Sequence, residues 1–246
     1  MSTLDASPPP GYGPIALLDR KRHAERGVKA GAARFASTLH AIPLTLPEFI
    51  AAGRSCPLVF ARAGSEWQTL MIVGLAEHQN LCVDAAGDWR TDCYVPAYVR
   101  RYPFCTAMTT RRDGERVVCV DEAGLGAQPP FLFDARGEET PAWREIDKLI
   151  RELDIASRQT SLFCQSIAEL GLLEPFDAAL RPVVGTERQL TGLWRVAESR
   201  LNALPADAIV TLMRTGFLSR LYAHLMSLDN FQRLLGLQVQ AERSRA

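Results

Sequence analysis

Residues 57–73 read PLVFARAGSEWQTLMIV, and this stretch decides the fold class. It contains two apolar, strand-like runs, 57–61 and 67–73, joined by a short loop that includes Gly64. Two such runs around a short glycine-containing loop are typical of a β-hairpin. The loop is too short for the helical crossover that parallel strands need, so the two strands are predicted to be antiparallel.

The segments on either side of this hairpin extend the same pattern. Residues 81–83 and the residues from Trp89 onward flank a turn at 84–88, and 106–110 and 116–120 flank an Asp-Gly turn. We therefore expect an antiparallel β-meander over 56–120, within a β-rich part that spans about 40–135. Further expected elements lie toward the N-terminus. They are short strands at 14–18 and 32–39 and a helix that begins after Thr45 and ends at Gly53.

The second half of the chain has helical spacing of its apolar residues. Thr140 and Pro141 form an N-cap signal, and the helix that follows is predicted to end at Gly171. One strand is expected at 190–196. Helices are then expected from about Pro205 to Gly216 and over 217–235, with Gly236 ending the last one.

Together these elements predict an α+β fold with an antiparallel β-meander in the N-terminal half packed against a helical C-terminal half. Residues 14–236 are predicted to form a single domain, helical over 140–236. Residues 1–13 (MSTLDASPPPGYG) are predicted to be a disordered leader and residues 237–246 a frayed tail.

Charge and hydropathy limit the classes of function. The chain has 28 lysines plus arginines and 28 aspartates plus glutamates, so its formal net charge is zero. A nucleic-acid-binding protein usually shows a basic excess, which disfavours that class here. The sequence contains neither an apolar run long enough to span a membrane nor a secretory signal. We therefore expect a cytoplasmic protein without membrane insertion.

Cysteine and histidine spacing provides no recognisable metal or catalytic motif. The six cysteines are widely spaced: Cys56, Cys82, Cys93, Cys105, Cys119 and Cys164. Without a CxxC pair, they are expected to be buried free thiols rather than zinc ligands or a disulfide framework. The four histidines form no metal-binding pair, and no G-x-S-x-G elbow is present. No metal, cofactor or catalytic residue is predicted.

The segment 94–104, YVPAYVRRYPF, is the best candidate for a binding site. Its members and a nearby tryptophan are the predicted ligand-binding residues: Trp89, Tyr94, Arg100 and Arg101. Arginine offers a planar fork for a carboxylate or phosphate, and aromatic rings offer faces for stacking, which suits a peptide or a small anion. The alternative is that the aromatic rings pack in the core while one arginine pairs with an acid and the other meets water.

The order of the segments resembles the bacterial SapC family, which is named after a component encoded at a surface-layer protein locus. The likeness covers about residues 14–236 and is carried by 34–36 (RFA), 42–44 (IPL) with Glu48 and Phe49, 56–60 (CPLVF), 94–104 after Trp89, 132–134 (LFD) with Gly137, 170–175 (LGLLEP), 190–192 (LTG) and 221–228 (LYAHLMSL).

The resemblance implies a non-enzymatic accessory or binding protein, with a peptide or protein target linked to surface-layer or export pathways. It supplies no catalytic residue. Members are sometimes labelled as peptide-transport permeases, and the absence of a membrane span from this sequence argues against that label. The alternative is an enzyme that acts on a peptide or an amino-acid-derived substrate, with Arg100 or Arg101 holding a carboxylate.

Overall fold

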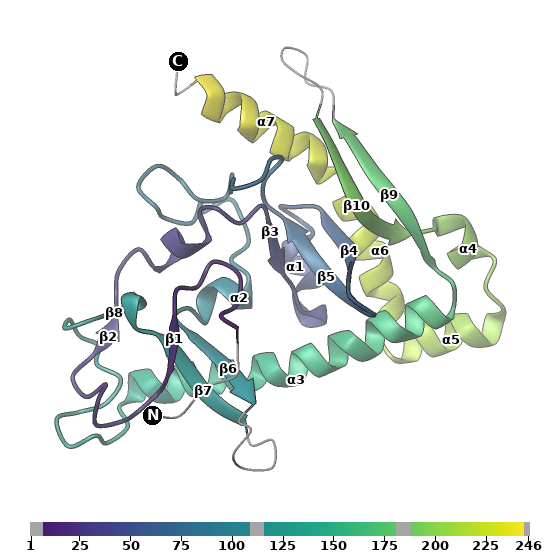
Figure 1. Ribbon diagram of the computed structural model, residues 1–246. Coiled ribbons are helices and arrows are strands. Elements are labelled where there is room, and N and C mark those ends of the chain that lie inside the picture. Colours follow the sequence, from purple (N-terminus) through teal and green to yellow (C-terminus); the bar gives the residue numbers. More distant parts are fainter. Residues whose placement is uncertain (1–6, 109–115, 181–187, 244–246) are drawn as a thin grey trace.

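The computed structural model describes residues 7–108, 116–180 and 188–243, and it confirms the predicted α+β class (Figure 1). Its largest sheet has five strands in the order β3-β5-β4-β10-β9. These strands are β3 (Ala41–Pro43), β4 (Leu58–Ala63), β5 (Glu66–Ile72), β9 (Leu173–Leu180) and β10 (Arg188–Val196). All pairings in it are antiparallel.

Two smaller antiparallel sheets complete the β structure. The three-stranded sheet β1-β7-β6 is formed by β1 (Ile15–Leu17), β6 (Phe104–Met108) and β7 (Arg116–Asp121), and β2 (Gly27–Val28) pairs with β8 (Leu125–Gly126). The short helices of the first half are η1 (Ala32–Ala36), η2 (Leu46–Glu48), α1 (Phe49–Ala52), α2 (Ala97–Arg100) and η3 (Glu122–Gly124). The helices of the second half are α3 (Pro141–Glu169), α4 (Glu198–Asn202), α5 (Ala206–Arg214), α6 (Phe217–Ser227) and α7 (Asn230–Arg243).

The strands of the expected meander belong to two different sheets. The β4–β5 hairpin lies in the five-stranded sheet, whereas the β6–β7 hairpin lies in the three-stranded one. Between them, the expected pairing of 81–83 with the segment after Trp89 is reduced to a single bridge, Val83 with Trp89. Pro96 and Pro103 flank α2, and because proline cannot donate a ladder hydrogen bond the chain leaves one sheet there and enters the other.

The hairpin β9–β10 brings the second half of the chain into the same sheet as the first. β10 covers the strand predicted at 190–196, but β9 was not predicted. Pro175 and the lack of alternation obscure β9 in the sequence, and proline is tolerated there because β9 is an edge strand. β10 joins the first-half sheet through the pair Trp194 and Phe60.

Two other boundary predictions are wrong. The strand expected at 32–39 is instead the 3₁₀ helix η1, which follows Gly31 in the left-handed region at φ 71°. The last predicted helix is two helices, α6 and α7, and Gly236 does not end the second one. α7 continues to Arg243 because the next turn is held by packing: Leu237 and Gln238 are both buried. A glycine inside a helix costs only about 1 kcal/mol, which such packing offsets.

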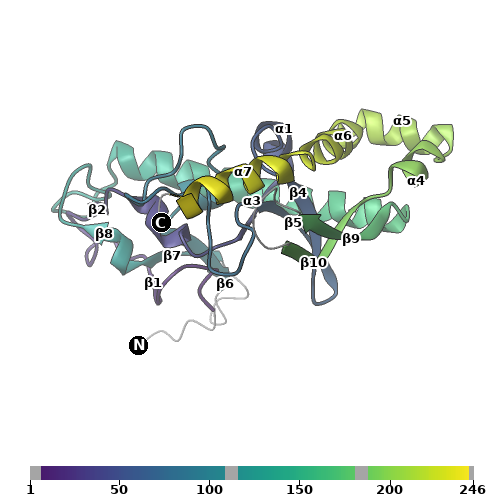
Figure 2. The ribbon, with the colours of Figure 1, turned by 90° about the horizontal axis from the view of Figure 1, so that it is seen from above.

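α3 begins as predicted and connects the two main sheets. The Thr140 side chain accepts a hydrogen bond from Trp143 N, and Pro141 occupies the first turn. The helix runs from the three-stranded sheet to the far end of the five-stranded sheet and contacts both β6 and β5 (Figure 1). On the five-stranded sheet, α1 and α6 lie to one side, with α6 against β4 and β10 (Figure 2). None of the helices in the described ranges is long and apolar enough to cross a membrane.

The described part of the leader packs against the domain. The Tyr98 hydroxyl donates to Pro10 O over 2.6 Å, and the Tyr12 hydroxyl donates to Phe104 O over 2.9 Å. Residues 1–6 lie outside the described residues. The N-terminal segment from residue 7 onward thereby forms one wall beside α2.

Candidate functional site

The four predicted site residues separate into two groups. α2 is a single turn, so Arg100 and the following Arg101 leave it in different directions. Arg100 is exposed, while Arg101 is half-buried and lines a groove. Trp89 Nε1 donates to Tyr94 O over 3.1 Å, and neither residue lines that groove. Arg100 interacts with the Tyr94 side chain, so Trp89, Tyr94 and Arg100 lie together, whereas Arg101 lines the groove apart from them.

The groove lies between β5 and α3. The groove consists of two adjoining cavities of about 390 Å³ and 280 Å³, and Glu66, Trp67 and Ser161 line both of them. We call it the β5–α3 groove. It is bounded by 66–69 of β5 and by one face of α3 between residues 153 and 169, with Arg101 at one end and Glu169 at the other.

The floor of the groove is kept open by small side chains on α3. Ser157, Ser161, Cys164 and Ala168 recur every three or four residues, so they share one face of the helix. The Ser157 and Ser161 hydroxyls donate to the carbonyls four residues earlier, over 2.8 Å and 3.2 Å. Their hydroxyl groups are thus hydrogen-bonded within the helix, and the small side chains on this face leave the groove unfilled.

The wall formed by β5 includes an open strand edge. On one side of β5, β3 pairs only with residues 70–72 of β5. On the other side, β4 pairs with β5 over the whole length of β4. Thr69 O accepts from Leu44 N and Val73 N donates to His40 O, so the odd-numbered residues direct their backbone groups toward β3. Because this alternation has a period of two, Trp67 directs its N–H and C=O to the same side, beyond the end of β3.

Arg101 places a positive charge at the end of the groove opposite Glu169. Its Cζ lies 4.8 Å from the centre of the Tyr98 ring, and its buried Nε has no hydrogen-bond partner among the described residues. Burial raises the pKa of Tyr12 and of Tyr98, so these neighbours stay neutral and do not balance the charge of Arg101. Burial, and then the charges of Arg158 and Arg101, lower the pKa of Arg116, as expected where guanidinium groups gather.

The buried carboxylate of Glu48 holds the segment that carries Arg101. Its Oε1 accepts from Ala97 N over 2.7 Å and from the Tyr94 hydroxyl over 3.2 Å. Its Oε2 accepts from Thr45 N and the Thr45 hydroxyl over 2.9 Å and 2.6 Å. One side chain thus joins the start of η2 to the start of α2.

Replacement of Glu48 by glutamine is expected to destabilise the protein by about 2–3 kcal/mol, because an amide nitrogen cannot accept and one buried donor loses its partner. Urea denaturation measures this loss. Glu138→Gln at an exposed carboxylate is the matched control and should change the unfolding free energy by less than about 0.5 kcal/mol. Equal stability of Glu48→Gln and the wild type would contradict the role assigned to Glu48.

Cys164 and Thr160 line the groove, and neither is activated as a nucleophile. Burial raises the pKa of the Cys164 thiol to about 12, so it is not a thiolate at neutral pH. The Thr160 hydroxyl donates to Ala156 O and accepts from Leu46 N. Over the ranges 7–108, 116–180 and 188–243, no histidine lines the groove to act as a base.

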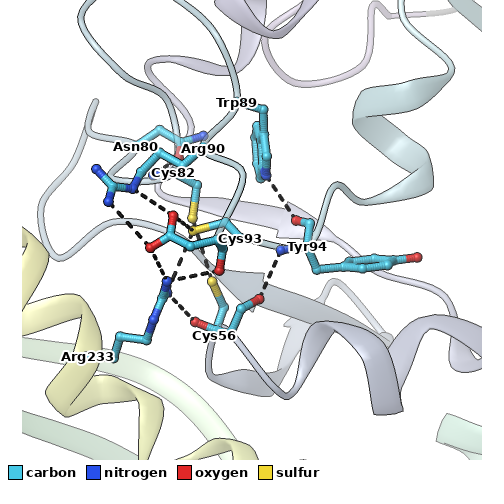
Figure 3. A network of polar contacts seen from close by, with 10 residues as sticks. Cys56, Asn80, Cys82, Trp89, Arg90, Cys93, Tyr94 and Arg233 are labelled. Carbon is cyan, nitrogen blue, oxygen red and sulfur yellow. Dashed lines mark hydrogen bonds and ion pairs between the residues drawn. The ribbon is translucent and has the colours of Figure 1, made fainter.

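A second cluster lies beside Trp89 and Tyr94, and no sequence motif predicts it. Cys56, Cys82 and Cys93 converge there, all buried and all within 4.8 Å of one another at their sulfur atoms (Figure 3). Hydrogen bonds from the Cys56 and Cys82 thiols, and then Arg233, lower the pKa of Cys93. The wide spacing of these cysteines in sequence concealed the cluster, because it is assembled by folding and matches no local metal-binding motif.

Comparison with known proteins identifies the family. The SapC family model matches residues 18–234 of the chain. The chain belongs to the SapC family. The match spans the five-stranded sheet, α2, α3 and α6, so it includes the β5 and α3 walls of the groove, while Pro9 and Pro10 of the groove precede it. Neither a curated protein nor a solved structure matches the chain.

Proposed function

We propose that this SapC-family protein is a non-enzymatic, cytoplasmic accessory protein that binds an extended peptide segment with a free terminal carboxylate in the β5–α3 groove. The observation that carries the proposal is the open edge of β5 at Trp67 beside the half-buried Arg101. The target, a peptide or the end of a protein, is proposed to belong to a surface-layer or export pathway, as the family resemblance implies.

The open edge of β5 supports a peptide rather than a compact small molecule. An extended peptide can add to a sheet edge through main-chain hydrogen bonds, independent of its sequence. Trp67 lies beyond the end of β3, so within the described residues β3 does not pair with its N–H and C=O, and the small face of α3 leaves room for alternate side chains. Such an edge, if left exposed, would otherwise be a site for aggregation.

The polarity of the groove supports a preferred direction of binding. Arg101 at one end can form a bidentate pair with a carboxylate, and Arg158 adds a positive charge near Arg116, whose own guanidinium pairs with Asp154. Glu169 is exposed at the other end, and Glu66 is exposed where the two cavities adjoin. A peptide with a free carboxylate toward Arg101 and a positively charged amine toward Glu169 would complement both ends.

The cysteines support a reducing compartment. All six are free, although Cys56 Sγ and Cys82 Sγ lie only 3.6 Å apart. In an oxidising compartment, thiols this close would tend to form a disulfide. The proposed cytoplasmic location is tested by fractionation of the host cell.

Replacement of Arg101 by glutamine is expected to weaken binding of free-acid peptides by about 10- to 100-fold, the value of a charge-assisted hydrogen bond of roughly 1.5–3 kcal/mol. The probe is a pool of short random-sequence peptides, prepared as free acids and as C-terminal amides. Calorimetry on the individual retained peptides gives the affinities. The exposed Arg100→Gln variant is the matched control and should bind as the wild type does.

Amidation of the peptide should weaken wild-type binding by the same factor and leave Arg101→Gln unaffected, because both changes remove the same ion pair. Retention of no peptide by the wild-type protein would overturn the proposal. Equal losses in Arg100→Gln and Arg101→Gln would overturn the assignment of Arg101.

A further inference from the structure

Three segments that are distant in sequence each contribute one cysteine to a single buried point. Cys56 lies between α1 and β4, Cys82 lies in the loop after β5, and Cys93 lies in the loop before α2 (Figure 3). Their exposed fractions are 0%, 0% and 5%. Chance packing of small apolar side chains can bring two thiols together, but here three sulfur atoms point at one another from separate loops.

The distances between the sulfur atoms match those around a thiolate-bound metal ion. A zinc–sulfur bond is about 2.3 Å, so two sulfurs on a tetrahedral zinc ion lie about 3.8 Å apart. Cys56 Sγ and Cys82 Sγ are 3.6 Å apart, and all three pairs are within 4.8 Å. Closure of the remaining gap needs only small side-chain rotations.

The charges around the cluster suit a divalent ion. Arg233 Nη1 lies 3.6 Å from Cys93 Sγ, and the same guanidinium pairs with Asp92 over 2.8 Å. Arg90 also pairs with Asp92, over 3.1 Å, so two guanidinium groups face one carboxylate and leave one positive charge. Three thiolates on a divalent ion carry one negative charge, which this positive charge balances. A monovalent ion would leave two negative charges.

Hydrogen bonds to two backbone carbonyls fix the position of the Arg233 guanidinium beside the cluster. Its guanidinium donates to Ser55 O over 2.8 Å and to Asp92 O over 3.0 Å, and these residues adjoin Cys56 and Cys93 in the chain. Ser55 Oγ also accepts from Tyr94 N over 3.0 Å. Outer contacts of this kind orient the ligands of a metal site.

We propose that Cys56, Cys82 and Cys93 bind one Zn²⁺ ion as a three-thiolate site. Each thiol that is protonated loses its proton to solvent as its sulfur–zinc bond forms. The fourth position of the tetrahedron is taken by water or by Asp92, whose Oδ1 lies 3.9 Å from Cys93 Sγ. The ion ties the α1–β4 connection to the two loops on either side of Trp89, so its role is to fix this part of the domain.

The test uses the full-length chain, purified under reducing conditions and freed of metal by a chelator. Co²⁺ is added as the probe, and absorbance is followed for the thiolate-to-cobalt charge-transfer band. One equivalent of Co²⁺ should saturate the band, and Zn²⁺ should abolish it by displacement. Absence of the band from the wild-type protein overturns the proposal, whatever the behaviour of the variants.

Each of Cys56→Ser, Cys82→Ser and Cys93→Ser should lower the Zn²⁺ affinity by more than 100-fold, since loss of an outer contact alone costs about 10- to 100-fold. Cys164→Ser removes another buried thiol of the same core and is the matched control, with unchanged affinity expected. Circular dichroism establishes that each variant is folded before titration. Equal Zn²⁺ affinity in the wild type and in folded variants of the three ligands overturns the proposal.

Discussion

Replacement of His224 by alanine is expected to lower the free energy of unfolding by about 3–5 kcal/mol, because it leaves two buried backbone groups unpaired and creates a cavity. His224 is fully buried on α6. Its Nδ1 lies 2.9 Å from Leu58 O, and Val196 N donates to its Nε2 over 3.1 Å. The ring therefore bonds β4 and β10 at once, as the neutral tautomer with its proton on Nδ1.

The position of His224 explains the size of this effect. β4 and β10 pair at Phe60 and Trp194, and the same antiparallel register places Leu58 opposite Val196. There the imidazole stands between the strands, and Ser227 Oγ accepts from Leu58 N over 2.9 Å. Side chains of α6 thus complete a strand ladder that the backbone alone leaves open.

Urea denaturation of His224→Ala at neutral pH measures the predicted loss. Met226→Ala is the matched control, since Met226 lies on the same helix but is 75% exposed. Its replacement should change the unfolding free energy by less than about 0.5 kcal/mol. An unfolding free energy of His224→Ala within that range of the wild type would exclude the bridging role.

Acidification should destabilise the protein through the same residue. Burial lowers the pKa of His224 to about 4, from about 6.5 in an unfolded chain. Between these two values the unfolded state binds more protons than the folded state, so stability is greatest above pH 6.5 and falls as the pH decreases toward 4. The shift corresponds to about 3 kcal/mol at the acid end of this window.

Urea denaturation at a series of pH values from 7 to 4 measures this loss. Carboxylates also titrate in this range, so the informative quantity is the difference between the wild type and His224→Gln, which keeps an uncharged polar group. Between pH 7 and pH 4, the variant should lose about 3 kcal/mol less unfolding free energy than the wild type loses. Parallel pH profiles of the two proteins would show that His224 is not the group responsible.

The candidate site illustrates how far the sequence leads. The segment 94–104 was identified from its two arginines and its aromatic residues, and Arg101 does line a groove. The groove itself could not be predicted, because its walls come from β5, from α3 and from the N-terminal segment. The small face of α3 at Ser157, Ser161 and Ala168 was a usable signal that the apolar periodicity obscured.

What the sequence determined by itself is local. The β4–β5 hairpin follows from two apolar runs around a glycine-containing loop, and the start of α3 follows from Thr140 and Pro141. Both depend on residues close together in the chain, whose conformational preferences act whatever the rest of the fold does. The α+β class follows from the same local signals.

Only the tertiary structure decided how these elements combine. Residues that look alike in sequence, such as Arg100 and Arg101, receive different environments because one turn of helix sends them in different directions. His224 of α6 bridges β10 and β4, and the thiol cluster is formed by residues from three separate loops. Such contacts form only where burial of distant segments repays the ordering of the chain between them, and no local pattern records that balance.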